Sequence, residues 1–223
     1  MAKFLPSEKR GVIFDFDGTL AHTLDDIASA VNEVLVQFRF APLDVDAIRA
    51  MIGNGLAILL QRASGSDDSA IVGAMVHQYR PVYLANMLSA TRLYDGVASM
   101  LDGLADAEVP MSVLSNKPHE FTAPLCDSLL ARWPFVCMEG ADDRFAKKPD
   151  PARALDICAR MGVSPAECLF VGDSAVDVMT GRNAGMVPIA VTWGYRDRAE
   201  LTRAEPLRLV DSPDQLAALL VSN

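Results

Sequence analysis

The chain has 223 residues, of which 51% are hydrophobic and 22% are charged. This length and composition are typical of a globular protein with one sizeable domain or two small ones, and they exclude a disordered chain. The net charge is -9, from 20 Lys and Arg against 29 Asp and Glu, and the sequence contains no basic run. We therefore expect neither a nucleic-acid partner nor a polybasic membrane-surface patch, since both depend on clustered positive charge.

The cysteines and the N-terminal residues indicate a cellular compartment. The cysteines show no C-x-x-C spacing and lie in apolar contexts (Cys126, Cys137, Cys158 and Cys168). This disfavours zinc and thioredoxin-type chemistry and is typical of reduced core residues. The first ten residues are charged and contain Pro6, which does not fit a secretory signal peptide. No apolar run approaches the length of about 18 residues that a membrane span needs, so we expect a cytoplasmic protein without a membrane partner.

The first predicted element is a buried strand over residues 12–14 that ends in two carboxylates. Val12-Ile13-Phe14 runs directly into Asp15, and Asp17-Gly18-Thr19 follows. In open α/β sheets, ligands bind just outside the carboxyl ends of the strands. Two carboxylates this close repel each other unless a cation lies between them. The alternative is an ordinary strand-to-turn boundary, where Asp and Gly are common.

Residues 21–92 are predicted to be helical throughout, with no convincing strand. Thr23 and Asp26 fit a capping box, and apolar residues at helical spacing follow (Leu24, Ile27, Val31, Val34, Leu35 and Phe38). Asp44 fits the N-cap of a short helix, and two further helical segments run to about residues 63 and 89. Gly53-Asn54-Gly55 interrupts the pattern before the first of these. This stretch indicates a separate helical module inserted after the first strand.

From Leu93 onward the sequence alternates between helices and short apolar strands. Strands are predicted over residues 111–114, 135–138, 168–171, 187–192 and 207–210, with helical segments between most of them. This order predicts an α/β fold with a doubly wound parallel sheet, covered on both faces through right-handed crossovers.

Four polar clusters follow strand-like segments and should meet at one edge of the sheet: Asp15/Asp17, Ser115/Asn116, Lys147/Lys148 and Asp173/Asp177. Carboxylate oxygens suit a hard divalent cation, and we expect Mg²⁺. The Ser115 hydroxyl suits phosphate oxygens, and a lysine would neutralise a transferring phosphoryl group. We expect Lys148 rather than Lys147 to point inward and Lys117 to face solvent.

These clusters resemble the four ordered motifs of the haloacid dehalogenase superfamily. The motifs are Asp15-x-Asp17-Gly18-Thr19-Leu20, Ser115-Asn116-Lys117-Pro118, Lys148-Pro149-Asp150-Pro151 and Gly172-Asp173-Ser174-x-x-Asp177. The helical insertion resembles the small all-helical cap of that superfamily. The resemblance implies a Rossmann-like hydrolase core over residues 1–20 and 93–223, with a cap domain over residues 21–92.

The resemblance also implies roles for the motif residues. Asp15 would be the nucleophile that takes the phosphoryl group, and Asp17 the general acid and base. Ser115, Asn116 and Lys148 would bind the phosphate. The metal ligands would be Asp15, Asp17 through its backbone carbonyl, Asp173 and Asp177. An acid two residues after the nucleophile is absent from the dehalogenating members, which favours a phosphatase or a mutase.

Several further motifs are similar to the phosphoglycolate phosphatase branch, among them Ile52-Gly53-Asn54-Gly55 and Thr192-Trp193-Gly194-Tyr195. His22 departs from that branch, which usually has an acidic residue there. Gly53, Asn54 and Gly55 are candidates for binding the substrate in the cap, or they form a simple turn between helices. Trp193 and Tyr195 follow a predicted strand; we expect them to serve packing, with a place at the interface between the two domains as the alternative.

The resemblance predicts a Mg²⁺-dependent phosphomonoester hydrolase for phosphoglycolate or a similar small organophosphate, as a monomer or homodimer. Residues 21–92 contain no lysine, so the cap has no amine that could form a Schiff base with a substrate. A sugar phosphomutase or another small-metabolite phosphatase on the same core is one alternative. A non-catalytic binding protein that retains the fold is the other.

Overall fold

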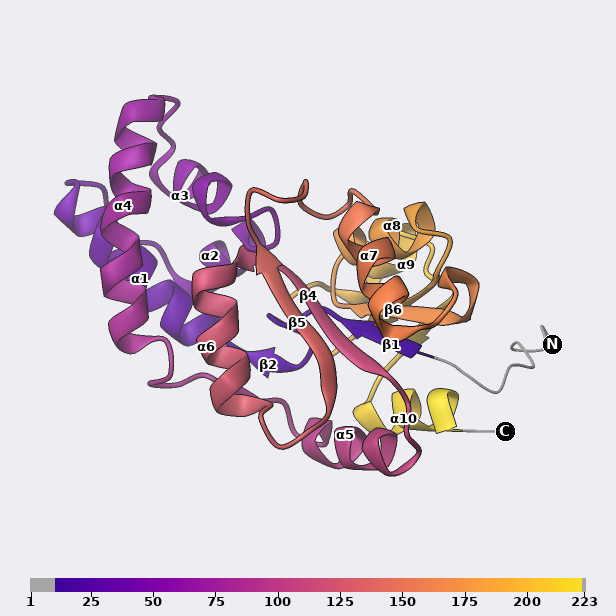
Figure 1. Ribbon diagram of the computed structural model, residues 1–223. Coiled ribbons are helices and arrows are strands. Elements are labelled where there is room, and N and C mark those ends of the chain that lie inside the picture. Colours follow the sequence, from indigo (N-terminus) through magenta and orange to yellow (C-terminus); the bar gives the residue numbers. More distant parts are fainter. Residues whose placement is uncertain (1–10, 222–223) are drawn as a thin grey trace.

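A computed structural model describes residues 11–221, and it contains a sheet of six parallel strands (Figure 1). The strand order is β5-β4-β1-β6-β7-β8. The strands span Gly11–Phe14 (β1), Met111–Pro118 (β4), Phe135–Ala141 (β5), Cys168–Gly172 (β6), Val187–Val191 (β7) and Arg208–Val210 (β8). The predicted fold class, an α/β protein with a doubly wound parallel sheet, is confirmed.

Helices cover both faces of this sheet because its central strand is apolar on both sides. Val12 and Phe14 of β1 face the core that includes α5 (Val97–Asp106), α6 (His119–Leu129) and α10 (Pro213–Val221). Ile13 faces the opposite core beside α7 (Ala152–Met161). This alternation follows from the two-residue period of a strand. The remaining elements of this half are η1 (Pro165–Glu167), α8 (Ala175–Asn183) and α9 (Arg198–Arg203), and α7, α8 and α9 lie together in Figure 1.

Four helices form a module at one end of the sheet (Figure 1). They are α1 (Leu24–Gln37), α2 (Val45–Met51), α3 (Leu56–Ser64) and α4 (Ser69–Asn86), and we call them the helical module. Two chain crossings join the module to the sheet, and they pair as an antiparallel ribbon of β2 (Ala21–His22) and β3 (Arg92–Leu93). The prediction of no strand in residues 21–92 was therefore wrong at both ends. Strands of two residues are too short to give a periodic pattern.

The capping box predicted at Thr23 and Asp26 is also wrong. Thr23 precedes α1 but makes no side-chain capping bond. The Asp26 carboxylate instead accepts hydrogen bonds from the backbone N–H groups of Ala90 (3.0 Å) and Thr91 (2.8 Å). Asp26 thus ties the start of α1 to the chain that leaves α4, which fixes the two ends of the module together.

Helix α9 was not predicted, because it has only six residues and lies between loops. Asp197 caps it by accepting a hydrogen bond from the Glu200 N–H group (2.7 Å). The four cysteines are buried and unpaired, as expected for core residues. No helix within residues 11–221 has the length and apolar character needed to cross a bilayer.

Candidate active site

The ends of β1 and β6 bring Asp15 and Asp173 together, because these strands are neighbours in the sheet. The Asp15 N–H group donates to the Val171 carbonyl (2.8 Å), which continues the pairing of the strands up to the carboxylate. Asp177 lies in the first turn of α8, where its side chain and that of Ser174 form a capping box. Oxygens of Asp15, Asp173 and Asp177 all lie within 4.8 Å of one another.

Lys148 lies against these carboxylates. Its Nζ atom is 3.0 Å from Asp15 Oδ1 and 2.6 Å from Asp177 Oδ1, and its side chain is 2% exposed. The neighbouring Lys147 is exposed, so the expectation that Lys148 is the inward lysine agrees with the structure. Asn116 holds the backbone of Lys148 from both sides: its Oδ1 accepts from the Lys148 N–H group (2.8 Å) and its Nδ2 donates to the Lys148 carbonyl (3.0 Å).

The charges in this cluster do not balance within the chain. Burial raises the pKa of Asp15 to about 7, although the ammonium group of Lys148 opposes the rise. Burial also raises the pKa of Asp173 well above its ordinary value, with repulsion from Asp177 and Asp15 adding to it. Three carboxylates against one ammonium group are an all-oxygen donor set with excess negative charge, which fits a hard divalent cation.

Asp17 is held by a second lysine, Lys117. The Lys117 Nζ atom donates to Asp17 Oδ1 (2.7 Å), and the Thr23 hydroxyl donates to the same oxygen. The Lys117 side chain is 7% exposed, and its ammonium group lies 4.9 Å from the centre of the Tyr83 ring. The expectation that Lys117 faces solvent was therefore wrong. Strand β4 extends through Pro118, four residues beyond its predicted end, and carries Lys117 inward toward Asp17.

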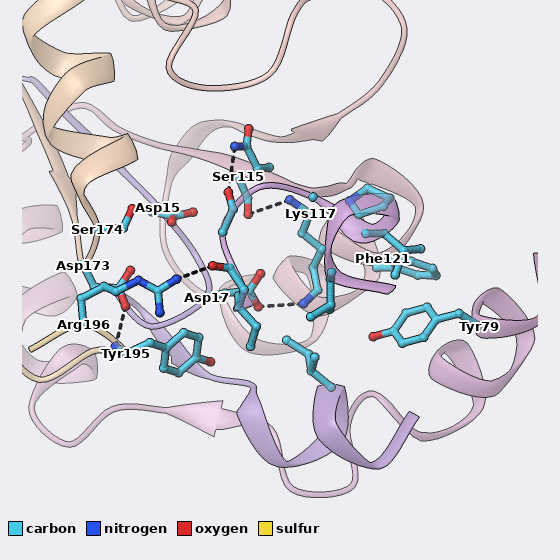
Figure 2. A pocket seen from close by; sticks show the side chains of 18 residues that line it. Asp15, Asp17, Tyr79, Ser115, Lys117, Phe121, Asp173, Ser174, Tyr195 and Arg196 are labelled. Atoms are coloured by element: carbon cyan, nitrogen blue, oxygen red, sulfur yellow. Dashed lines mark hydrogen bonds and ion pairs between the residues drawn. The ribbon is translucent and has the colours of Figure 1, made fainter. Parts of the chain in front are cut away.

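A cavity opens between this sheet edge and the helical module (Figure 2). Asp15, Asp17, Ser115 and Asp173 line its polar side, with Asn116 and Lys117 beside them. The Ser115 hydroxyl accepts a hydrogen bond from the Lys117 N–H group (3.2 Å). The side opposite the carboxylates is formed mainly by apolar side chains of the module and of α6.

Of the three predicted residues in the module, Gly53 and Gly55 line the cavity and Asn54 does not. Asn54 Oδ1 accepts a hydrogen bond from Arg62 Nη1 (3.0 Å). The Gly53 carbonyl accepts from Asn116 Nδ2 (3.0 Å), so a residue of the sheet holds this loop. Both Asn116 donors are therefore used, to Gly53 and to Lys148.

The loop after β7 adds two residues to the site that sequence reasoning did not assign to it, Tyr195 and Arg196. The Tyr195 N–H group donates to Asp173 Oδ2 (2.6 Å). Arg196 donates to the carbonyls of Arg49 (2.8 Å) and Ile52 in the module. The preceding residue, Gly194, approaches Asp173 so closely that a Cβ atom would lie 2.3 Å from the aspartate Cβ. The motif Trp193-Gly194-Tyr195 was the available signal, since a glycine marks close backbone approach.

The sequence matches the model of the haloacid dehalogenase-like hydrolase family over residues 12–191. The chain belongs to this family. That span includes the strand ends with their carboxylates and the whole helical module. The resemblance inferred from the four motifs is confirmed.

Similar proteins with a named activity indicate which kind of hydrolase this chain is. The chain is 34% identical over 216 residues to a phosphoglycolate phosphatase of Pseudomonas putida, covering 95% of this chain and 78% of the relative. It is 34% identical to phosphoglycolate phosphatase 1 of Pseudomonas aeruginosa, covering 91% of this chain and 76% of the relative. Among solved structures, a predicted phosphoglycolate phosphatase from Haemophilus somnus is similar with a TM-score of 0.87 and 26% identity, covering 95% of this chain and 97% of that one. The chain is therefore a phosphatase of this family, similar to phosphoglycolate phosphatases.

Proposed function

We propose that this protein hydrolyses a small phosphomonoester, with Mg²⁺ as cofactor and an aspartyl-phosphate intermediate on Asp15. One observation carries the proposal. Three separate segments supply Asp15 with Asp17, Lys148 and Asp173. The three aspartates line one end of a single cavity, and Lys148 contacts Asp15 there. These are a nucleophile, an acid, a cation and a metal ligand, the groups that such a reaction needs.

Asp15 is the proposed nucleophile because its carboxylate lies at the cavity and is oriented by its neighbours. The Phe16 N–H group donates to Asp15 Oδ1 (2.7 Å), and Lys148 Nζ contacts the same oxygen (3.0 Å). Attack on the phosphorus atom forms the bond from Asp15 to phosphorus and releases the alcohol. Water then attacks the same phosphorus and frees the carboxylate. Covalent catalysis of this kind divides one difficult displacement into two easier ones.

Asp17 is the proposed general acid and base. It would protonate the leaving alcohol in the first step and take a proton from water in the second. Its carboxylate lines the cavity and is fixed by Lys117 and Thr23. Ser115 would donate to a phosphoryl oxygen, and Lys148 would balance its charge. Asn116 remains a candidate phosphate ligand. Its contacts to Lys148 and Gly53 support a second role, in which it positions the backbone of these two residues.

Asp15, Asp173 and Asp177 would hold the metal, together with the backbone carbonyl of Asp17. When bound, a divalent cation of this kind offsets the repulsion between an anionic nucleophile and an anionic ester. The acidic cluster and the raised pKa values of Asp15 and Asp173 support this assignment, because the buried carboxylates lack a sufficient counter-charge. Mg²⁺ suits such a set because it binds through few carboxylates and keeps several waters.

The helical module is the proposed cap domain, over residues 21–92, with residues 1–20 and 93–223 as the core. The cap would exclude bulk water from the reaction, as lids of other enzymes do. Arg196 and Asn116 support this proposal, because both reach from the core to backbone carbonyls of α2 and of the loop at Gly53. We also propose a cytoplasmic protein, in keeping with its unpaired cysteines, that acts as a monomer or homodimer.

Phosphoglycolate is the proposed substrate, on the strength of the similarity to phosphoglycolate phosphatases over nine tenths of the chain. The test is phosphate release from phosphoglycolate, sugar phosphates and nucleotides, each with Mg²⁺ and with a chelator. We expect Mg²⁺-dependent release that is fastest with phosphoglycolate and equal in amount to the ester consumed. Ester loss without free phosphate would indicate a mutase instead. No release from any ester, with Asp15→Asn indistinguishable from the native protein, would overturn the proposal.

A further inference from the structure

The hydroxyl group of Tyr79, on α4, points into the cavity without a partner. The Tyr79 side chain lines the cavity, is 3% exposed, and aims its hydroxyl toward Asp17 and Lys117 (Figure 2). Among residues 11–221 no group forms a hydrogen bond with this hydroxyl, although the ring has contacts on several sides. Buried polar groups are nearly always hydrogen-bonded in proteins, and this hydroxyl, which faces the cavity without a protein partner, is available to a ligand that binds there.

Packing fixes the direction of this hydroxyl. The Tyr79 ring stacks on Tyr83, with ring centres 5.2 Å apart and planes 18° from parallel. Phe121 of α6 meets the Tyr79 ring edge-on, with centres 6.0 Å apart. Burial raises the pKa of Tyr79 well above its ordinary value, so the hydroxyl keeps its proton and acts as a donor. The donor is therefore placed in advance, which reduces the entropy lost on binding.

The surrounding wall limits what can bind there. Apolar side chains flank Tyr79 on the cavity side opposite the carboxylates (Ile27, Leu56, Leu59 and Phe121). They offer nothing to the several hydroxyl groups of a sugar or a nucleoside, and burying such groups without hydrogen bonds is costly. A short group with a single polar end therefore fits this wall better than a sugar or a nucleoside does.

Lys117 supplies a positive charge near the same point. Its ammonium group uses one donor on Asp17, and an ammonium group has three. The other cation on the cavity wall, Arg196, is directed to the carbonyls of Arg49 and Ile52. A single anionic acceptor on a short leaving group would therefore meet the Tyr79 hydroxyl and Lys117 together.

We propose that Tyr79 is a specificity-determining residue: its hydroxyl binds the carboxylate of a short phosphorylated hydroxy acid, at the end opposite the phosphate. This inference rests on the proposed phosphatase function and specifies the class of substrate. Sugar phosphates and nucleotides are excluded by the apolar wall, and phosphate esters of the same size without a carboxylate bind more weakly.

The test compares Tyr79→Phe with Tyr83→Phe on two esters. Phosphoglycolate and ethyl phosphate are similar in size, but only the former has a carboxylate. Tyr83 is the matched control, because its hydroxyl is buried, has no partner and does not line the cavity. We expect Tyr79→Phe to lower kcat/KM for phosphoglycolate about tenfold or more, mainly through KM, as for a lost hydrogen bond to a charged group. Its kcat/KM for ethyl phosphate should stay within about twofold, and Tyr83→Phe should change neither value.

The other outcomes separate a failure of the inference about Tyr79 from a failure of the proposed phosphatase function. Equal losses on both esters, or the same loss in Tyr83→Phe, would mean that Tyr79 acts through packing, and the inference would be wrong. A native enzyme that hydrolyses both esters equally well would also overturn it, while the phosphatase function would stand. If the native enzyme with Mg²⁺ hydrolysed neither ester nor any other phosphomonoester, the proposed function itself would fail, and the inference with it.

Discussion

Two buried lysines hold the acidic residues of the site from opposite sides. Lys148 contacts Asp15 and Asp177, and Lys117 contacts Asp17. Both lysine side chains are almost fully buried, so each pair has little water around it. Removing one member of such a pair leaves a charge without a partner, which costs much more than the pair contributes in net stability.

Replacing Lys117 with Met should therefore destabilise the protein. The variant keeps most of the side-chain volume but leaves Asp17 with only the Thr23 hydroxyl as a partner. We expect the free energy of unfolding to fall by roughly 2 kcal/mol or more, measured by urea denaturation. The matched control is Lys147→Met, on an exposed lysine, where a change within about 0.5 kcal/mol is expected. Equal effects in the two variants would contradict the assigned role of the buried pair.

The positions of Lys117 and Thr23 could not be predicted from the sequence. The four motifs indicated which carboxylates meet, because parallel strands end at one edge. They did not indicate that β4 continues through Pro118, and Lys117 therefore looked solvent-facing. Thr23 fits the N-cap pattern in the sequence, but its hydroxyl donates a hydrogen bond to Asp17 instead. Both outcomes depend on partners far away along the chain, which a local pattern does not contain.

Glu139 joins β5 to α7 and to the loop that leads to Lys148. Its carboxylate accepts from Arg160 of α7 (2.7 Å) and from Arg144 of the loop (2.9 Å), and it lies 3.7 Å from Arg153 of α7. Burial alone would raise the pKa of Glu139, but the bond from Arg160 and the charges of the arginines around it lower the pKa below its ordinary value.

This lowered pKa predicts how the stability depends on pH. A carboxyl group whose pKa is lower in the folded state stabilises the protein above its unfolded pKa, and the contribution is lost as the pH falls through the folded pKa. We expect Glu139→Gln to lower the free energy of unfolding by roughly 1–3 kcal/mol at pH 7. The difference from the native protein should persist down to about pH 5 and shrink below about pH 4.5.

The control is Glu33→Gln, on an exposed glutamate of α1, whose effect should be small at every pH. Denaturation curves over this pH range provide the measurement. A difference for Glu139→Gln that grew as the pH fell would contradict the account.

Most elements were predictable because each carried its own pattern, whereas the exceptions were short. The central strands β1 and β6 are continuous apolar runs, as expected for strands buried on both faces. Helix α9 has six residues and the ribbon strands β2 and β3 have two each, too few to establish a period. The pairing of β2 with β3 arises because the chain leaves and re-enters the core at one place.

For the whole molecule, metal binding at the acidic cluster would be coupled to folding. The raised pKa of Asp15 means that the folded protein loses stability as the pH rises from the ordinary value near 3.8 toward about 7, where the buried carboxyl ionises. Asp173 contributes in the same direction. A divalent cation would bind the ionised form, and its affinity should therefore increase over the same pH range.

Adding Mg²⁺ should therefore raise Tm, and by more at pH 7 than at pH 5. At a concentration of about 100 times Kd, the stabilisation is about 2.7 kcal/mol. Asp173→Asn should remove most of the shift, because it deletes one ligand of the proposed site. Asp106→Asn, on an exposed aspartate of α5, should retain it in full. A shift of equal size in both variants would mean that the ion binds elsewhere.

A single-turnover experiment with Asp17→Asn tests whether Asp15 accepts the phosphoryl group. Asp17→Asn would be mixed with acetyl phosphate and Mg²⁺, since acetate leaves without a general acid. We expect one equivalent of acetate in a burst, followed by a stall, because no base activates water in the second step. The mass of the protein should increase by one phosphoryl group, carried on the peptide that contains Asp15, and Asp15→Asn should gain none. A label on another residue, or acetate release by Asp15→Asn at the same rate, would contradict the account.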